Sequence, residues 1–165
     1  MIYEVAASYS RAVDYLRQLV ADVPDEMLRR QINGVVNHPA WVIGHVIYSC
    51  QAIGGEMGIN PWLPPDWAER FGTGTVPVEA KKDYPSKQEL LDALSDAQQR
   101  VNDRLFALGD LGLTVPLPDE RYREIFPTLG HAVLHILTVH TAIHVGQVTV
   151  WRRAIGLGPL DRILT

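Results

Sequence analysis

The sequence predicts an all-α protein, a four-helix bundle with a long crossover between its second and third helices. Apolar residues recur at helical spacing in four long segments, over residues 2–21, 38–54, 86–108 and 128–155. About 30 residues separate the second segment from the third, which is longer than most connections inside a compact domain. We find no internal repeat and expect residues 1–165 to form a single domain.

The first two helices have end signals in the sequence. The first helix ends before Pro24, and a short helix is expected directly after that proline, through Arg30. Asn37 or His38 is the expected N-cap of the second long helix, with Pro39 in its first turn.

The crossover, residues 56–85, is expected to be folded because it carries two tryptophans. A short helical turn is expected at residues 66–71. Trp62 and Trp67 could roof a pocket, although packing alone explains two buried indoles equally well.

The third long helix has signals at both ends. Ser86 and Glu89 match a capping box, in which each side chain bonds a free backbone N–H at the start of the helix. Gly109 is the expected end of the helix, and a connector over residues 109–127 leads to the last helix.

The last helix, residues 128–155, is the most informative stretch. It holds four of the six histidines, and no Asp, Glu, Lys or Arg lies between Pro127 and Arg152. Its length and lack of charge would permit a membrane span. Four histidines, a glutamine and several threonines make such a span costly, so we expect no membrane partner.

Helical spacing sorts these histidines onto two faces. His140 and His144 lie four residues apart on the apolar face, where both imidazoles can reach one metal ion. The alternative is that each is a core histidine with a single hydrogen bond. His131 and His135 fall on the opposite face.

A third metal ligand would come from a facing helix of the bundle. The best candidate is His45, on the inner face of the second helix, with His38 or a loop carboxylate of Asp66 or Glu69 as alternatives. Three neutral imidazoles leave one position open for water or substrate, which is the pattern of a catalytic site. Imidazole suits zinc, nickel, copper and iron, so the ligands do not fix the metal.

Two motifs resemble the DinB/YfiT-like superfamily. The sequence WVIGH at residues 41–45 resembles the W-x-x-G-H segment of that family's second helix. The sequence HTAIHVGQ at residues 140–147, followed by Arg152 or Arg153 and Gly156, resembles its last-helix signature H-x3-H-x-G-Q…R…G. Both motifs occur in the expected order with the long crossover between them, so the resemblance covers nearly the whole chain.

The resemblance implies a homodimeric four-helix bundle that binds one divalent metal ion, usually nickel or zinc, through His45, His140 and His144. It also implies similarity to transferases and isomerases that use a low-molecular-weight thiol, such as bacillithiol or mycothiol, as a cosubstrate. Ile136 stands where many members carry another histidine, and Val145 where many carry a basic residue. Either departure could change the substrate preference or the surroundings of the ligands.

Several functions fit an open three-histidine site. A coordinated thiol loses its proton readily, which suits a thiol-dependent S-transferase acting on a small molecule. The alternatives are a metal-dependent hydrolase, a binding module without turnover, and an interaction protein whose histidines belong to the core. No general base is evident beside the ligands. Trp41, Ser49 and Gln147 are expected to lie near the ligands, lining the pocket or orienting a histidine.

Charge and cysteine content argue against other classes. The net charge of −4 and a pI near 5.8, with no basic stripe, argue against nucleic-acid binding. The chain begins without a signal-peptide pattern, and the lone Cys50 cannot form an internal disulfide, so a cytoplasmic location is expected. Cys50 is interpreted as a small buried residue rather than a nucleophile.

The outward face of the last helix carries small residues four positions apart, which would let another helix approach closely. This strip, which consists of His135, Ala142, Gly146, Thr149 and Arg153, fits either an internal contact of the bundle or a homodimer seam. From the strip and the family resemblance together we expect a homodimer.

Overall fold

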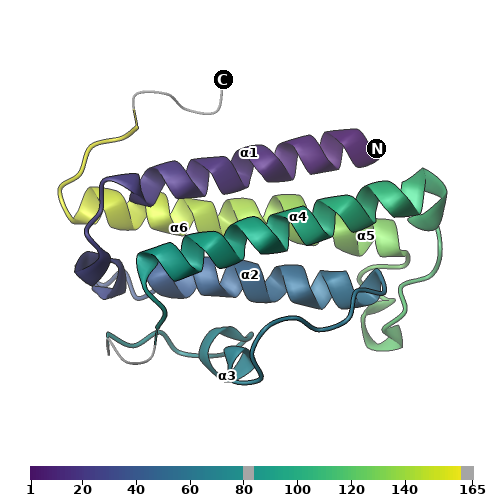
Figure 1. Cartoon of the computed structure of the whole chain (residues 1–165), viewed down its shortest axis with the longest axis horizontal. Helices are drawn as coiled ribbons and strands as arrows, with labels where there is room; N and C mark the ends of the chain where they lie inside the picture. Colours follow the sequence, from purple (N-terminus) through teal and green to yellow (C-terminus); the bar gives the residue numbers. More distant parts are fainter. Residues whose placement is uncertain (80–83, 161–165) are drawn as a thin grey trace.

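Four long helices form a bundle in the computed structural model, which describes residues 1–79 and 84–160 (Figure 1). Three of them are α1 (Ile2–Ala21), α2 (Pro39–Glu56) and α4 (Lys87–Gly112). The last helix consists of three consecutive segments, α5 (Leu129–Leu134), η4 (His135–His140) and α6 (Thr141–Ala154). The described residues contain no strand, so the all-α bundle is confirmed.

Each long helix packs against two neighbours: α1 and α2 both contact α4 and α6. In Figure 1, α2 and α4 run in the same direction, opposite to α1 and the last helix. Two adjacent parallel helices cannot be joined by a tight turn, because the chain must first return along the full length of the bundle. This direction of travel is the physical reason for the long crossover.

The crossover is folded onto α2. Its short helix α3 (Trp67–Phe71) confirms the turn expected at residues 66–71, and both of its terminal aromatic residues are buried. The indole N–H of Trp67 donates to the carbonyl of Gly44 at 3.0 Å. Of the predicted crossover, residues 80–83 lie outside the described part.

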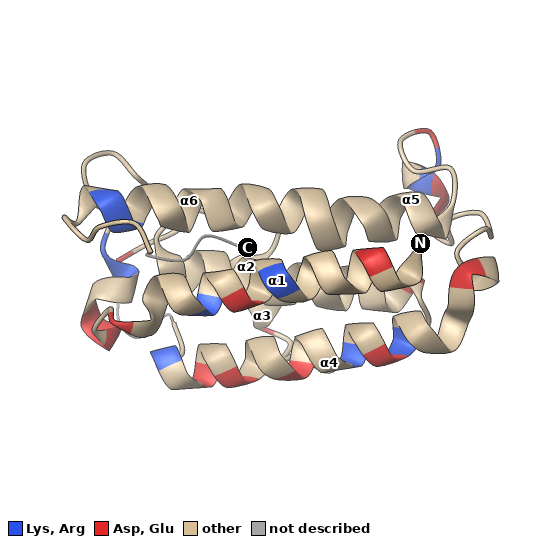
Figure 2. Cartoon of the chain, turned by 90° about the horizontal axis from the view of Figure 1, so that it is seen from above, with Lys and Arg blue, Asp and Glu red and all other residues tan. Residues whose placement is uncertain are grey.

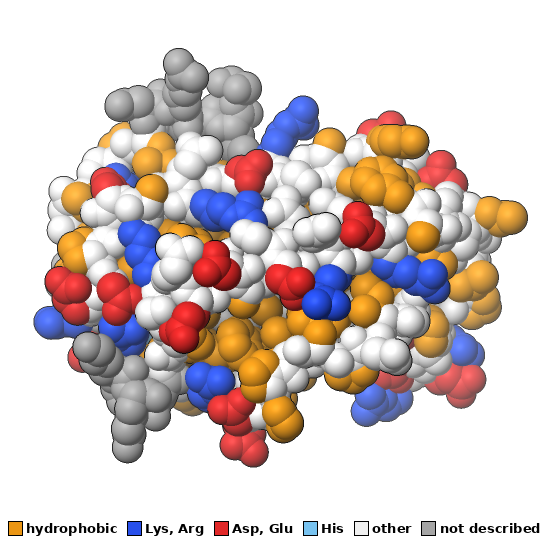
Figure 3. Space-filling view, in the orientation of Figure 1, with side chains coloured by type: hydrophobic (Ala, Val, Ile, Leu, Met, Phe, Trp, Pro, Cys, Tyr) orange, Lys and Arg blue, Asp and Glu red, His pale blue; other side chains and the backbone are white. Residues whose placement is uncertain are grey.

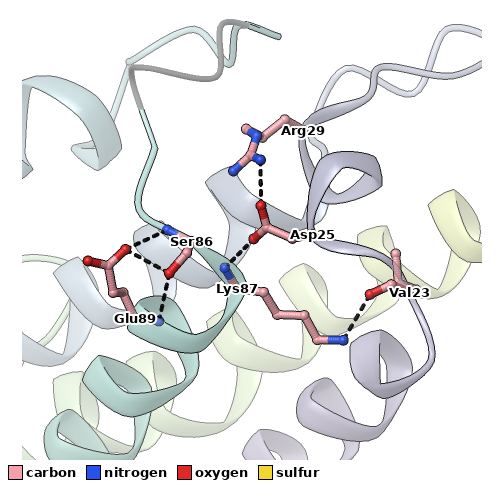
Figure 4. A network of polar contacts seen from close by, with 6 residues as sticks. All are labelled: Val23, Asp25, Arg29, Ser86, Lys87 and Glu89. Carbon is pink, nitrogen blue, oxygen red and sulfur yellow. Dashed lines mark hydrogen bonds and ion pairs between the residues drawn. The ribbon is translucent and has the colours of Figure 1, made fainter.

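The helix ends follow most of the expected signals. His38 is the N-cap of α2, and its Nδ1 accepts the N–H of Trp41 at 3.3 Å. The capping box of Ser86 and Glu89 is present at the start of α4 (Figure 4). Gly109 breaks the regular helix with φ +66°, although one more turn continues to Gly112.

A short 3₁₀ turn, η1 (Asp25–Arg29), follows Pro24 where a short helix was expected. The carboxylate of Asp25 binds both the side chain of Arg29 and the backbone N–H of Lys87 (Figure 4). The ammonium of Lys87 in turn donates to the carbonyl of Val23 at 2.8 Å. These bonds fix the start of α4 against the end of α1.

The last helix departs from the predicted regular α-helix in its middle, where η4 is a π-helical turn. The hydroxyl of Thr141 donates to the carbonyl of Ile136, five residues earlier, at 3.0 Å. A π-helical turn holds one residue more than an α-helical turn, and such turns are frequent at functional sites. His140 is the last residue of this turn.

The last helix is the one described segment whose length and mean hydropathy, 1.3, match a membrane span. In the bundle it packs against α1 and α2, an arrangement compatible with a soluble protein. In Figure 2 its ribbon carries no charged residue until near its C-terminus. There Arg152 binds Asp22, which follows α1. On the face shown in Figure 3, charged side chains of both signs are interspersed.

Candidate metal centre

His45 is held on α2 by groups on both sides of its ring. Its Nδ1 donates to the backbone carbonyl of Phe71 in the crossover, with 2.7 Å between the two atoms. The indole of Trp41 lies against the imidazole, with 4.8 Å between ring centroids. A Cβ on Gly44 would lie 2.2 Å from the Phe71 ring, so only glycine lets this part of the crossover approach.

His144 is held by a chain of two amides. Its Nδ1 donates to Oε1 of Gln147 at 2.9 Å. The same oxygen accepts the side-chain N–H of Asn37, which comes from the loop before α2, at 3.1 Å. The two donors fix the orientation of the Gln147 amide, and the amide fixes the orientation of the His144 ring.

The Nε2 atoms of three histidines converge between α2 and the last helix. Nε2 of His140 lies 3.2 Å from Nε2 of His45 and 3.2 Å from Nε2 of His144. The three ligand atoms all lie within 4.8 Å of one another. His45 and His144 are buried and His140 is partly buried, so the three nitrogens face a sheltered point.

The three rings are neutral at pH 7. Burial, with smaller effects from the charges of His144 and His45, lowers the pKa of His140 to about 4. Burial, followed by the charge of His45, lowers the pKa of His144 to about 4. Burial also lowers the pKa of His45. Neutral imidazole is the form that binds a metal.

These donors fit a divalent ion. Four tetrahedral ligands about 2.0–2.1 Å from a zinc ion lie about 3.4 Å apart, close to the 3.2 Å separations on either side of His140. Because Nδ1 of His45 and of His144 is used as a donor, Nε2 of both rings presents a lone pair toward the same point. In the described part of the chain no aspartate, glutamate or cysteine joins the group.

Comparison of the sequence with models of protein families identifies the family of this chain. The sequence model of the DinB superfamily matches residues 8–148, which include all three converging histidines. The chain belongs to the DinB superfamily. A search of curated protein sequences found no match.

The structure of this DinB protein brings together the three residues selected from the sequence, His45, His140 and His144. Gln147 and Trp41 contact two of them directly, as described above. Ser49 contacts no imidazole by hydrogen bond, since its hydroxyl donates to the backbone carbonyl of His45 at 2.9 Å. That bond is a local helical contact to the residue four positions earlier.

The alternative third ligands lie elsewhere in the fold. Both ring nitrogens of His38 are occupied, Nδ1 by the N–H of Trp41 and Nε2 by the carbonyl of Val78 at 3.0 Å. The carboxylate of Asp66 pairs with Arg70 at 3.2 Å, and Glu69 is exposed. Neither carboxylate belongs to the histidine group.

The remaining candidates have structural positions. Trp67, the first residue of α3, packs against α2, and the Trp62 indole lies against Gly54. The described ring contacts of the three histidines include neither indole. Cys50 is buried and bonded to the hydroxyl of Tyr9 at 2.8 Å, and burial raises its pKa to about 12. That thiol is therefore a small core group, as expected.

Three features of the site were not found from the sequence: the Phe71 carbonyl, Asn37 as a partner of Gln147, and the π-helical turn that carries His140. A backbone carbonyl and a π-helical turn cannot be recognised from the residue types in the sequence. The glycine directly before His45 was the available signal, because glycine inside a helix marks a position where another group packs closely.

Proposed function

We propose that this DinB protein is a metal-dependent S-transferase that holds one divalent ion, zinc or nickel, on His45, His140 and His144. The observation that carries the proposal is the convergence of three neutral Nε2 atoms with no fourth protein ligand in the described chain. Three imidazoles with an open position are the donor set of a catalytic rather than a structural site.

The chemistry supplied by the bound ion is the deprotonation of a thiol that coordinates it. This suits the surroundings of the site, because none of the described carboxylates belongs to the histidine group. The same ion could instead lower the pKa of a bound water, which is the chemistry of the alternative hydrolase. Cys50 is buried and protonated, so the thiol must come with a cosubstrate.

The chain's own residues orient the ligands and keep water from part of the site. Phe71 and Gln147 accept from the two Nδ1 atoms and leave both Nε2 lone pairs available. The indole of Trp41 covers one face of the His45 ring. A cytoplasmic location would supply low-molecular-weight thiols in reduced form and agrees with a single reduced cysteine.

Metal content tests the first half of the proposal. Elemental mass spectrometry on tag-free protein is expected to find about one zinc or nickel ion per chain, and His144→Ala is expected to lose it. His131→Ala, at an exposed position, serves as the matched control and should keep the metal. Equal metal in all three proteins, or none after incubation with either ion, would make the inward histidines core residues.

Turnover tests the second half. The metal-loaded protein is expected to transfer a low-molecular-weight thiol to a small electrophile, and His144→Ala should lose that activity. Metal binding without any thiol transfer would leave a binding module, and hydrolysis without added thiol would favour the hydrolase.

We further propose that two copies associate through the outward face of the last helix. Val139, Ile143 and Val150 are about half exposed there, and Ala142 and Gly146 are exposed beside them. No group lies within 4 Å of a Cβ placed on Gly146, so a second helix could approach closely at this point. Of the strip predicted from the sequence, His135 and Thr149 are partly buried.

A further inference from the structure

His38 is fully buried at the start of α2, with 0% of its surface exposed, and it lies outside the histidine group of the metal centre. Its Nδ1 accepts the backbone N–H of Trp41 at 3.3 Å, which caps the helix. Its Nε2 donates to the carbonyl of Val78 in the crossover at 3.0 Å. A backbone N–H only donates and a carbonyl only accepts, so this pair of bonds needs a neutral ring.

The crossover is fastened to the start of α2 around Val78. The hydroxyl of Tyr84 accepts the N–H of Val78 at 2.9 Å, and the Tyr84 ring meets the His38 ring edge-on, with 4.9 Å between centroids. The side chain of Gln31 donates to the neighbouring carbonyl of Pro77 at 2.9 Å. Both backbone polar groups of Val78 are thus bound by side chains, and one of these, His38, belongs to the residue type that changes its charge near neutral pH.

We propose that the two hydrogen bonds of His38 form a pH-sensitive latch, which releases the Val78 end of the crossover when the ring gains a proton. An imidazolium carries N–H groups on both nitrogens, so it can no longer accept the N–H of Trp41. A buried charge without its partners is costly, and the positive end of the α2 dipole adds repulsion. The charged ring therefore moves into water, and its bond to Val78 is lost with the cap.

The groups that face His38 set the direction of this switch. Burial is the largest effect and lowers the pKa of His38. The carbonyls of Val78 and Leu28 and the charge of Glu79 act in the opposite direction, and the charge of Arg29 on η1 adds to the effect of burial. The buried ring thus binds a proton less readily than a solvated ring, so the latch is closed at neutral pH and opens as the pH falls below about 6.5.

Opening of the latch would loosen one side of the metal centre. Trp41 is bound twice, through its backbone N–H by His38 and through its indole N–H by Thr75 of the crossover. Its indole stacks on the ring of His45. The latch itself needs no ion, whereas its effect on metal binding rests on the proposed function.

Hydrogen exchange measured by NMR on the full-length, ¹⁵N-labelled, metal-free chain tests the proposal. Protection of the backbone N–H groups of Trp41 and Val78, relative to an unfolded chain at the same pH, is expected to fall several-fold between pH 7.5 and 5. The upper limit is about 30-fold at pH 5, set by the ordinary histidine pKa of about 6.5. His140 and His144, with pKa values of about 4, stay largely neutral over this range.

A matched pair of variants separates the latch from other effects of acid. In His38→Asn the side-chain oxygen can cap the helix but does not titrate, so the protection of Trp41 should be the same at both pH values. His131→Asn, at an exposed position, should keep the fall seen in the natural chain. If His38→Asn does not fold, the pH series of the natural chain still decides.

Three results would overturn the proposal. The first is unchanged protection of Trp41 and Val78 in the natural chain at pH 5, and the second is an equal fall at Trp41 in His38→Asn. The third is a parallel fall at Val101, a buried residue inside α4, because that would indicate unfolding of the whole bundle rather than local release.

Isothermal titration with Zn²⁺ at pH 7.5 and 6 tests the effect on the metal centre. The natural chain is expected to lose up to about five-fold more affinity than His38→Asn, which is the value of the stack between Trp41 and His45. Equal losses would mean that the latch does not act on the metal centre. If neither protein binds zinc, the proposed function fails, and hydrogen exchange in the metal-free chain still decides whether the latch exists.

Discussion

The indole of Trp41 and the imidazole of His45 are stacked, with ring centroids 4.8 Å apart and only 9° between their planes. The indole N–H donates to the hydroxyl of Thr75 at 3.0 Å, and that hydroxyl donates to the carbonyl of Gly72. The crossover therefore fixes the position of the Trp41 indole, and the indole in turn packs against the imidazole of His45.

Replacing Trp41 by leucine should weaken zinc binding without removing a ligand. Loss of the stacked pair costs about 1 kcal/mol, or about five-fold in affinity. Isothermal titration with Zn²⁺ measures the change. Trp62→Leu is the matched control, because that indole packs against Gly54. Equal losses in both variants would show that general loosening, rather than the ring stack, is responsible.

Gly44→Ala should destabilise the fold at the point where the crossover meets α2. The added Cβ would lie 2.2 Å from the Phe71 ring, and overpacking of this kind costs about 1–3 kcal/mol. Displacing Phe71 would also move the carbonyl that holds His45, so zinc affinity should fall. Chemical denaturation and zinc titration measure the two effects.

Gly55→Ala provides the control on the same helix. No group lies within 4 Å of a Cβ at that position, and alanine favours a helix over glycine by up to about 1 kcal/mol. This variant should be as stable as the natural chain or more stable, with unchanged zinc affinity. A destabilised Gly55→Ala would mean that α2 tolerates no substitution of glycine.

The metal-free protein should lose stability as pH falls from about 6.5 toward 4. Burial lowers the pKa of His140 and His144 to about 4, whereas the ordinary value of histidine is about 6.5. Between those pH values the unfolded chain binds more protons than the folded chain. The free energy of unfolding therefore decreases as the pH is lowered. Each histidine adds a slope of at most about 1.4 kcal/mol per pH unit.

Urea denaturation at a series of pH values measures this slope, and His144→Leu should reduce it. His131→Leu, at an exposed position, should leave the slope unchanged. A slope that is the same in all three metal-free proteins between pH 6.5 and 5 would contradict the assignment of neutral, buried rings.

Ile143→Glu should convert the proposed dimer to a monomer. Ile143 is 56% exposed on the uncharged face of the last helix, and a carboxylate there would face its own copy across a two-fold interface. Light scattering at micromolar concentration reports the mass. The control is Asp103→Glu on α4, which keeps the charge of an exposed residue and should leave the measured mass unchanged. A natural chain with monomeric mass would refute the dimer.

Side-chain periodicity predicted the four long helices and placed His140 and His144 on the inward face, whereas His45 was one of several candidates by spacing and was implied by the family resemblance. The π-helical turn ends at His140, so the residues from His140 to His144 follow regular α-helical geometry. The predicted inward placement of this pair is therefore unaffected by the turn. The register before it was not predictable, since no residue type marks a π-helical turn. The contact between His45 and the Phe71 carbonyl was also not predictable, because every residue has a backbone carbonyl and none marks a contact between the crossover and α2.

The crossover supplies the carbonyl that orients the His45 ring. Metal binding at the centre therefore depends on the folding of this long connection onto α2. A partly folded chain, with the crossover undocked, has no fixed first ligand and would bind an ion more weakly. Linkage is reciprocal, so an ion in the finished site would oppose undocking by the same free energy. Proteases that cut exposed loops would then spare the loaded protein and remove the empty one.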